Sequence, residues 1–140
     1  MTFRIPVTVR GYELDALGHV NHAVYHQYGE VARTAGFTAA GCDWNGLVEQ
    51  RTAPVLLSTT VHFRRELRGN ETVEVSCELK FGTGKTFHID SMITKADGTL
   101  AAELYCVAGL MDLDARKLLE DPRRVLEKSG LRPEVLAGQD

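Results

Sequence analysis

One segment of the chain is apolar around most of a helical circumference, and this feature limits the folds that the chain can adopt. The segment is predicted to run from about His22 to Ala35, with Asn21 as its N-cap and Gly36 as the residue that ends it. Its apolar and small residues are Ala23, Val24, Tyr25, Tyr28, Val31, Ala32 and Ala35. A helix of this kind is expected to be buried on more than one side, so the rest of the fold must surround it.

The segments on either side of this helix alternate with the period of two that is typical of β-strands. One such segment, from Phe3 to Val9, precedes the helix, and four follow it at residues 55–63, 73–81, 87–93 and 100–108. Turn chemistry joins the later segments at Arg68-Gly69-Asn70, Gly82-Thr83-Gly84 and Asp97-Gly98. The stretch from Thr38 to Thr52 is predicted to be a loop anchored by Trp44. A short C-terminal helix is predicted between Asp121 and Gly130.

These elements predict an α+β fold in which an antiparallel five-stranded sheet wraps around one long central helix. The four strands after the helix are expected to follow one another as a meander. The length of 140 residues predicts one domain, over residues 1–140. The outer face of the sheet alternates polar residues with apolar ones, so a second subunit is expected to cover part of it. Those apolar residues are Leu56, Met92, Tyr105, Val107 and Met111.

Composition argues against several classes of protein. A formal net charge of -3 gives no reason to expect binding to nucleic acid or to an anionic membrane. Three cysteines without a close pair, Cys42, Cys77 and Cys106, disfavour a disulfide framework and a zinc knuckle, and are typical of the reducing cytoplasm. No segment has the length and hydrophobicity of a signal peptide or of a membrane span.

The stretch from Tyr12 to Tyr25 carries the chemistry. It places the carboxylate of Asp15 on a turn that contains Gly18 and leads directly into the helix. The N–H groups of the first helical turn lack intrahelical partners, and together with the helix dipole they favour negative charge. A carbonyl held between Asp15 and these N–H groups can be attacked from one side while its oxyanion is stabilised from the other.

The motif Tyr12-x-x-Asp15-x-x-Gly18-His19-Val20-Asn21-x-x-x-Tyr25, followed by Glu30-x-x-Arg33, resembles the hotdog-fold acyl-CoA thioesterases of the 4-hydroxybenzoyl-CoA thioesterase-like family. The resemblance covers about residues 3 to 111. It implies that Asp15 is the catalytic carboxylate, as general base or nucleophile, that the backbone N–H of His22 is the oxyanion donor, and that Gly18 is the turn residue. It also implies a homodimer or homotetramer with the site at the subunit interface.

The substrate implied is a thioester of CoA or of an acyl-carrier protein, and its hydrolysis needs no cofactor because thiolate is a good leaving group. His19, Asn21 and Tyr25 are expected to line the substrate site. Three cations are candidates for binding the CoA phosphates, although such residues are often solvated surface charges. They are Arg64, Arg65 and Lys85.

Two further features allow more than one interpretation. Glu30 is either a second catalytic carboxylate or the partner of Arg33 in an i, i+3 ion pair. His22 and His26 share a helical face, but no Glu follows His22 as in a zinc-protease motif, so no metal site is predicted.

Two other functions remain open within the same fold. A hydratase or dehydratase would use Asp15 and His19 to move protons, and an acyl-binding domain would need no catalysis. The Gly18-His19-Val20-Asn21 context favours the thioesterase.

Overall fold

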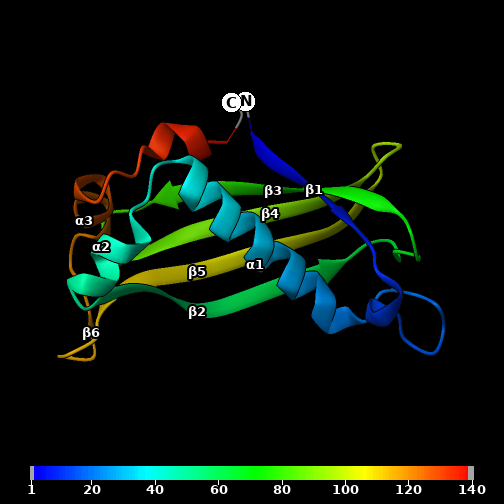
Figure 1. The fold of residues 1–140 in the computed structure, drawn as a ribbon, viewed down its shortest axis with the longest axis horizontal. Helices are drawn as coiled ribbons and strands as arrows, with labels where there is room; N and C mark the ends of the chain where they lie inside the picture. Colours follow the sequence, from blue (N-terminus) through cyan, green and yellow to red (C-terminus); the bar gives the residue numbers. More distant parts are fainter. Residues whose placement is uncertain (1, 139–140) are drawn as a thin grey trace.

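The structure, a computed structural model, describes residues 2–138 and shows an antiparallel sheet curled around one long helix (Figure 1). This is the predicted α+β hotdog architecture, except that a short sixth strand joins the five that were predicted. The strands are β1 (Phe3–Thr8), β2 (Thr52–Phe63), β3 (Thr72–Phe81), β4 (Thr86–Lys95), β5 (Leu100–Asp112) and the short β6 (Lys117–Leu118). The helices are α1 (His22–Ala39), α2 (Trp44–Glu49) and α3 (Pro122–Lys128), with 3-10 turns at Gly11–Glu13 and Pro133–Leu136.

The order of the strands in the sheet is β1-β3-β4-β5-β2, which corrects the predicted four-strand meander. Only β3, β4 and β5 follow one another as neighbours. Strand β2 pairs with β5, with Thr52 opposite Asp112 and Phe63 opposite Ala102. The free edge of β3 is occupied by β1, so β2 must find its partner on the far side of the sheet. The Arg68-Gly69-Asn70 turn therefore belongs to a crossover and not to a hairpin.

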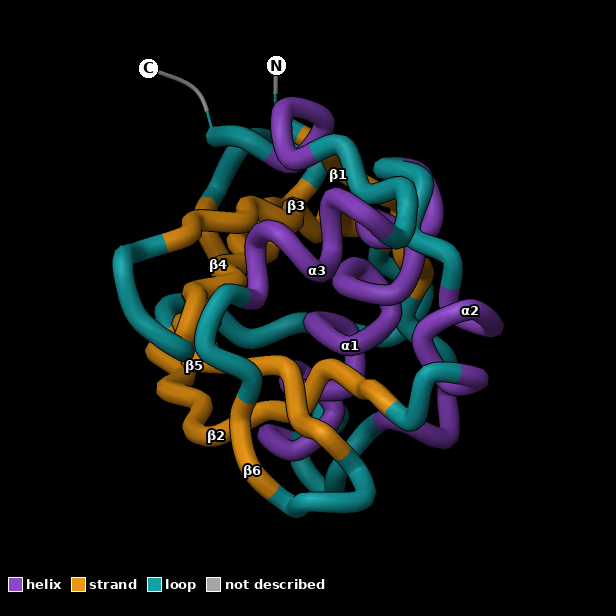
Figure 2. Tube along the Cα trace, turned by 90° about the vertical axis from the view of Figure 1, so that its left-hand side faces the viewer, coloured by secondary structure: helices purple, strands orange, loops and turns teal. Residues whose placement is uncertain are grey.

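Helix α1 lies inside the curl of the sheet, which runs from β1 at the top of Figure 2 through β4 to β2 at the bottom. Its buried face presents Tyr25, Tyr28, Ala32 and Phe37 to the inward side chains of the strands. Val31, on another side of the helix, is 50% exposed. Within one protomer the helix is therefore covered less completely than its apolar circumference predicts.

The start of α1 is as predicted, but its end is not. Asn21 Oδ1 accepts a hydrogen bond from the Ala23 N–H at 3.0 Å, as an N-cap does. The helix continues past Gly36 to Ala39, and the chain reverses at Gly41, where φ is +94°. Gly36 faces β3, and a Cβ there would lie 3.2 Å from the Cys77 sulfur. Glycine at this position allows the helix to approach the sheet closely, which is a different role from ending the helix.

The segment predicted as a loop, Thr38 to Thr52, contains the short helix α2, which Asp43 caps by accepting a hydrogen bond from the Gly46 N–H. Trp44 does anchor this segment, because its ring stacks on Phe37 with centroids 5.7 Å apart. The predicted C-terminal helix is confirmed as α3, with Asp121 as its N-cap and Gly130 at a φ of +106° just beyond it.

Candidate active site

The loop between β1 and α1 holds Asp15 at the entrance to the helix. Asp15 Oδ1 accepts hydrogen bonds from the backbone N–H groups of Leu17, at 2.9 Å, and His19, at 3.2 Å. Gly18 has a φ of +79°, which an L side chain adopts only with strain, and its N–H donates to the Asp15 carbonyl at 3.0 Å. Asp15 Oδ2 accepts no hydrogen bond from any described residue, and the side chain is exposed. One oxygen therefore fixes the orientation of the carboxylate and the other is open to a ligand.

The first turn of α1 presents an open backbone donor beside this carboxylate. The side-chain oxygen of Asn21 accepts from the Ala23 N–H, and its carbonyl accepts from the Val24 N–H at 2.9 Å. The His22 N–H has no acceptor among residues 2–138. Because α1 is 18 residues long, its dipole adds to the attraction of this donor for negative charge.

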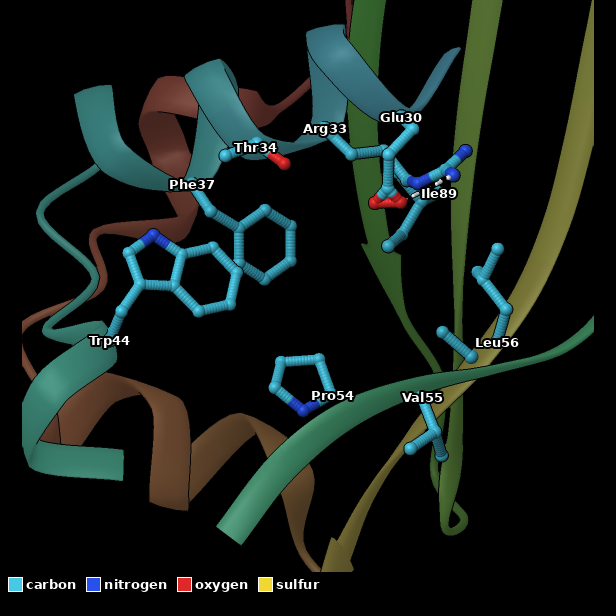
Figure 3. Close-up of a pocket in the computed structure, with 10 residues that line it drawn as sticks. Glu30, Arg33, Thr34, Phe37, Trp44, Pro54, Val55, Leu56 and Ile89 are labelled. Carbon is cyan, nitrogen blue, oxygen red and sulfur yellow. Dashed lines mark hydrogen bonds and ion pairs between the residues drawn. The ribbon is translucent and has the colours of Figure 1, made fainter. Parts of the chain in front are cut away.

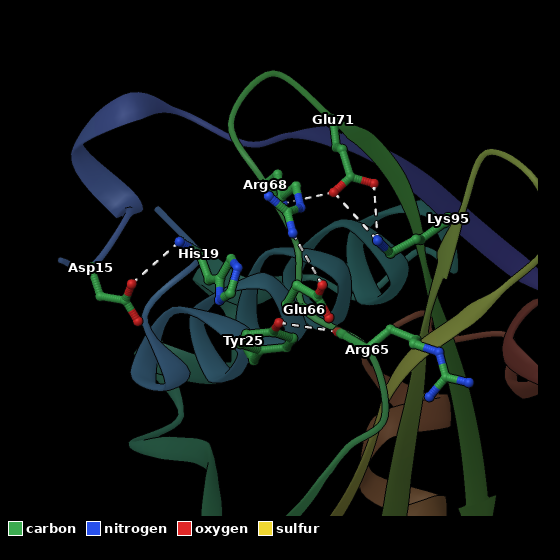
Figure 4. Close-up of polar contacts among 8 residues, drawn as sticks. All are labelled: Asp15, His19, Tyr25, Arg65, Glu66, Arg68, Glu71 and Lys95. Atoms are coloured by element: carbon green, nitrogen blue, oxygen red, sulfur yellow. Dashed lines mark hydrogen bonds and ion pairs between the residues drawn. The ribbon is translucent and has the colours of Figure 1, made fainter. Parts of the chain in front are cut away.

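A groove of about 300 Å³ joins these groups to the end of β2. It brings together four of the predicted site residues, Asp15, His19, His22 and Tyr25, with the predicted cations Arg64 and Arg65. Its other lining residues are Val20, Phe63 and Glu66. Figure 4 shows Asp15 and His19 on the left of this region, Tyr25 and Glu66 near its middle and Arg65 on the right.

Tyr25 forms the buried wall of the groove. Its side chain is almost fully buried, its ring meets the edge of Phe63 at 5.0 Å, and its hydroxyl donates to the Arg65 carbonyl at 3.4 Å. Burial raises the pKa of the Tyr25 hydroxyl above its ordinary value, so the side chain is neutral at neutral pH. Tyr25 therefore ties α1 to the segment that carries the arginines.

The three predicted cations do not form one cluster within a protomer. Arg64 pairs with Glu103 at 2.6 Å, and its guanidinium holds the pKa of that carboxyl below its usual value. Arg65 donates to the Arg64 carbonyl and forms no ion pair with a described carboxylate. Lys85 lies at the opposite end of the sheet. The next residue, Thr86, pairs with Gly109 of β5, and Gly109 pairs with Val55 near the start of β2, whereas the arginines follow the end of β2. Within one protomer, Lys85 is therefore far from the two arginines.

Glu30 lies in a second, apolar pocket and not beside Asp15 (Figure 3). It pairs with Arg33 at 3.2 Å, which is the predicted i, i+3 contact. The pocket has a volume of about 370 Å³ and lies between α1, α2 and the start of β2. Besides the ion pair, its lining includes Thr34, Phe37, Trp44, Pro54, Val55, Leu56, Ile89 and Ala108. In one protomer the two candidate carboxylates therefore occupy separate sites.

Sequence reasoning missed Glu13, a buried carboxylate behind the loop. Glu13 Oε1 accepts hydrogen bonds from the Tyr28 hydroxyl at 2.6 Å and from the Arg10 N–H at 2.8 Å. Burial opposes ionisation of Glu13, but these two bonds and the Arg10 guanidinium outweigh it and lower the pKa of the carboxyl. The sequence offered only half of a capping box at this turn, because Glu13 can accept from the Arg10 N–H three residues before it, but an Arg side chain has no acceptor for the Glu13 N–H. Nothing in the spacing pointed to Tyr28.

Residues 2–138 contain neither a metal-binding cluster nor a membrane-spanning helix. No group of three or more His, Cys, Asp or Glu side chains between residues 2 and 138 is arranged to hold a metal ion. None of the helices in this range has the length and hydrophobicity needed to cross a membrane.

Comparisons with known proteins agree with this architecture. The family model of the thioesterase-like superfamily matches residues 9–137. The chain is 26% identical over 123 residues to the long-chain acyl-CoA thioesterase FadM of Escherichia coli, covering 87% of this chain and 92% of FadM. It is 31% identical over 101 residues to the acyl-CoA thioester hydrolase YbgC of Escherichia coli, covering 72% of this chain and 75% of YbgC.

Solved structures show the same fold. The probable thioesterase YbaW from Escherichia coli superimposes with a TM-score of 0.80 at 24% identity, covering 92% of this chain and 98% of YbaW. A hypothetical protein from Staphylococcus aureus, solved in complex with CoA, superimposes with a TM-score of 0.84 at 17% identity, covering 100% of this chain and 88% of the other. At these identities the likeness is one of fold.

Proposed function

The chain belongs to the thioesterase-like superfamily, and we propose that it acts as one domain that hydrolyses an acyl thioester of CoA, or of an acyl-carrier protein, to a free acid and a thiol. The observation that carries this proposal is a carboxylate with one free oxygen beside the open N-terminus of an 18-residue helix, in one groove. The relatives FadM and YbgC are named for acyl-CoA hydrolysis, which supports CoA as the thiol.

The groups in the groove suit attack on a thioester carbonyl. As general base, Asp15 takes a proton from water, and the water oxygen attacks the carbonyl carbon. As nucleophile, Asp15 Oδ2 attacks the carbon itself, and water later hydrolyses the mixed anhydride. In both routes the carbonyl electrons move to the oxygen, where the His22 N–H stabilises the charge, and then return to expel the thiolate. One such donor typically contributes about 100- to 1,000-fold in rate.

A single turnover in ¹⁸O-labelled water tests the nucleophilic route. A general-base mechanism places the label in the released acid and none in Asp15. A nucleophilic mechanism in which water attacks the Asp15 carbonyl of the anhydride puts the label in Asp15 and leaves the first acid unlabelled, whereas attack on the acyl carbonyl labels the acid, so label in Asp15 is the result that identifies the nucleophilic route. Mass spectrometry of the acid and of the peptide that contains Asp15 gives the answer.

We further propose that the active form is at least a homodimer, joined through the free edge of β2. This strand has 12 residues and no Lys, Arg, Asp or Glu, and Leu56, Leu57 and Phe63 along it are exposed. Long apolar edge strands without charges attract other strands. The other edge strand, β1, has only six residues and carries Arg4, a charge of the kind that discourages pairing and that β2 lacks. A second copy of the chain is the partner that this edge fits.

Symmetric antiparallel pairing of two β2 strands would complete the site. It would set the start of β2 in one copy beside the end of β2 in the other. The Asp15 groove of one protomer would then face the apolar pocket at Trp44 and Pro54 in its partner, where we place the acyl group. The same pairing would bring Lys85 of one copy to the end that carries Arg65 of the other, so that both can contact the CoA phosphates. A homotetramer of two such dimers keeps this arrangement.

The deciding experiment offers a panel of acyl-CoA thioesters, from acetyl to long-chain and aromatic, and follows the free thiol. We expect thiol release from at least one class of acyl group. Asp15 and His19 lie in the same groove, so an enoyl-CoA is included to test for hydratase activity. Hydration without thiol release would replace our proposal with the hydratase, and binding without either reaction would indicate an acyl-binding domain.

A further inference from the structure

A buried carboxylate lies behind the proposed site without touching it. The Glu13 side chain is 8% exposed, and the Tyr28 side chain is 2% exposed. Their contact, from the Tyr28 hydroxyl to Glu13 Oε1, is 2.6 Å long. Burying a charge is unfavourable unless hydrogen bonds compensate, and here the compensation comes from Tyr28 on α1 and from Arg10 at the start of the loop.

Glu13 connects both ends of the loop that carries Asp15. Its side chain holds the Arg10 N–H, where the loop begins. Its carbonyl accepts from the Asn21 N–H at 2.9 Å, where the loop ends and α1 starts. Asp15 lies two residues after Glu13, and His22 follows Asn21. Glu13 therefore helps to fix the position of the Asp15 carboxylate relative to the His22 N–H.

The other attachments of the loop lead elsewhere. The Val20 N–H donates to the Leu67 carbonyl at 2.8 Å, and His19 forms a β-bridge with Arg68. Both hold the loop to the segment between β2 and β3. The Tyr28 hydroxyl, by contrast, comes from the second turn of α1, the same helix whose first residue, His22, lines the groove. This bond fixes the loop relative to the helix itself.

We propose that the Glu13–Tyr28 hydrogen bond is a positioning contact, which sets the distance between the Asp15 carboxylate and the N-terminus of α1. Neither residue touches the substrate, so neither is a catalytic residue. The inference rests on the proposed thioesterase function. It assigns a role in rate, and not only in stability, to a pair of residues outside the groove.

The test is a set of matched variants, each measured for kcat and KM on the best acyl-CoA. Tyr28→Phe removes one hydroxyl and keeps the ring, and Glu13→Leu removes the acceptor. Both are expected to lower kcat by about 10- to 100-fold, the effect of misplacing reacting groups, with KM within about twofold of the parent. Glu13→Gln keeps an oxygen at the Oε1 position and is expected to retain most of kcat. The double variant Glu13→Leu/Tyr28→Phe should lose no more than the larger single loss, because both changes remove the same contact.

Ser129→Ala is the control for a purely structural effect. The Ser129 hydroxyl donates to the Leu126 carbonyl at 2.6 Å, at the end of α3 and outside the groove. This change should lower Tm and leave kcat unchanged. If Tyr28→Phe behaves in the same way, with a lower Tm and the kcat of the parent, the positioning role is wrong.

Amide hydrogen exchange separates failure of this inference from failure of the proposed function. In Tyr28→Phe the N–H groups of Asp15, Gly18 and Asn21 should exchange faster than in the parent, while those of β4 and β5 stay protected. If the parent releases no thiol, the proposed thioesterase function is refuted. If Tyr28→Phe still shows faster exchange in the loop, Glu13–Tyr28 remains the contact that holds the loop. Unchanged exchange in the loop would overturn the inference whatever the activity.

Discussion

The two oxygens of the Asp15 carboxylate have different surroundings. Oδ1 accepts two backbone N–H groups of its own loop, while Oδ2 accepts no hydrogen bond from residues 2–138. Asparagine at this position can keep the Oδ1 contacts and replaces only the free oxygen with an amide nitrogen. Asp15→Asn is therefore a change of chemistry with little change of structure.

We expect Asp15→Asn to lower kcat by about 100-fold or more, because the amide neither accepts the proton of water nor attacks a carbonyl well. Asp97→Asn is the matched control, since Asp97 also accepts a backbone N–H in an exposed turn, from Thr99 at 2.9 Å. Thiol release and Tm are measured for both variants. Near-normal turnover in Asp15→Asn would move the catalytic role to Glu30.

The histidines at the start of α1 lead to a prediction about metals. Among residues 2–138, no third His, Cys, Asp or Glu is placed to complete a metal site with His22 and His26. The proposed chemistry uses a carboxylate and a backbone donor instead. Dialysis against EDTA should leave thiol release unchanged, as should added zinc at stoichiometric concentration. Loss of turnover with EDTA that zinc restores would require a metal mechanism.

At the scale of elements, the turn that follows α1 packs against the turn that follows α3 at two glycines. Gly41 has a φ of +94°, and a Cβ there would lie 2.7 Å from the Gly130 carbonyl oxygen. Gly130 has a φ of +106°, and a Cβ there would lie 2.6 Å from the Gly41 carbonyl oxygen. The two turns therefore pack backbone against backbone, and an alanine would meet both an unfavourable φ and a clash.

Gly41→Ala is expected to lower the free energy of unfolding by more than about 1 kcal/mol. Gly82→Ala is the control, because a Cβ at Gly82 meets nothing within 4 Å and its φ is not positive. Urea unfolding of both variants measures the difference. Equal stability of the two variants would mean that the turns between α1 and α3 rearrange at little cost.

The free edge of β2 is the element on which the proposed dimer depends. Ser58 is exposed near the middle of β2, and Ser58→Lys would place like charges close to the twofold axis. We expect this variant to sediment as the 15.5 kDa chain and to lose activity. Thr8→Lys adds the same charge to the other edge strand, β1, and should keep the oligomer. A parent protein that sediments as a monomer would refute the interface.

At the scale of the whole molecule, an acidic protein is expected to bind an anionic substrate. The formal net charge is -3, so cations near the groove must act locally. Because Arg64 is paired with Glu103, Arg65 is the stronger candidate of the two. Ionic contacts of this exposed kind weaken as salt screens them.

Arg65→Glu should raise KM for acyl-CoA more than it lowers kcat, because the phosphates lie far from the reacting carbonyl and contribute mainly uniform binding. A short thioester without the nucleotide should be nearly indifferent to the change. Arg4→Glu, on the outer face of β1, is the charge-matched control. Equal effects of Arg65→Glu on both substrates would show that Arg65 does not hold the CoA phosphates. Titration of KM with salt provides a second, independent measurement.

The local features of this protein were readable in the sequence. Alternation identified the strands, Asn21 and Asp121 marked the starts of α1 and α3, and Gly130 marked the end of α3. The stretch from Tyr12 to Tyr25 placed Asp15 next to the start of α1. These features depend on side chains within a few residues of one another, where backbone geometry leaves few alternatives.

Contacts between distant segments were decided only by the tertiary structure. The pairing of β2 with β5, the close approach of Gly36 to Cys77, the separation of Lys85 from Arg65 and the contact between Glu13 and Tyr28 each join positions that no local pattern links. An alternating pattern shows that a segment is a strand, but it does not show which strand pairs with it. The order of the strands depends instead on which edge of the growing sheet is still unpaired. Likewise, the burial of Glu13 depends on where α1 lies, which the packing of the whole sheet determines.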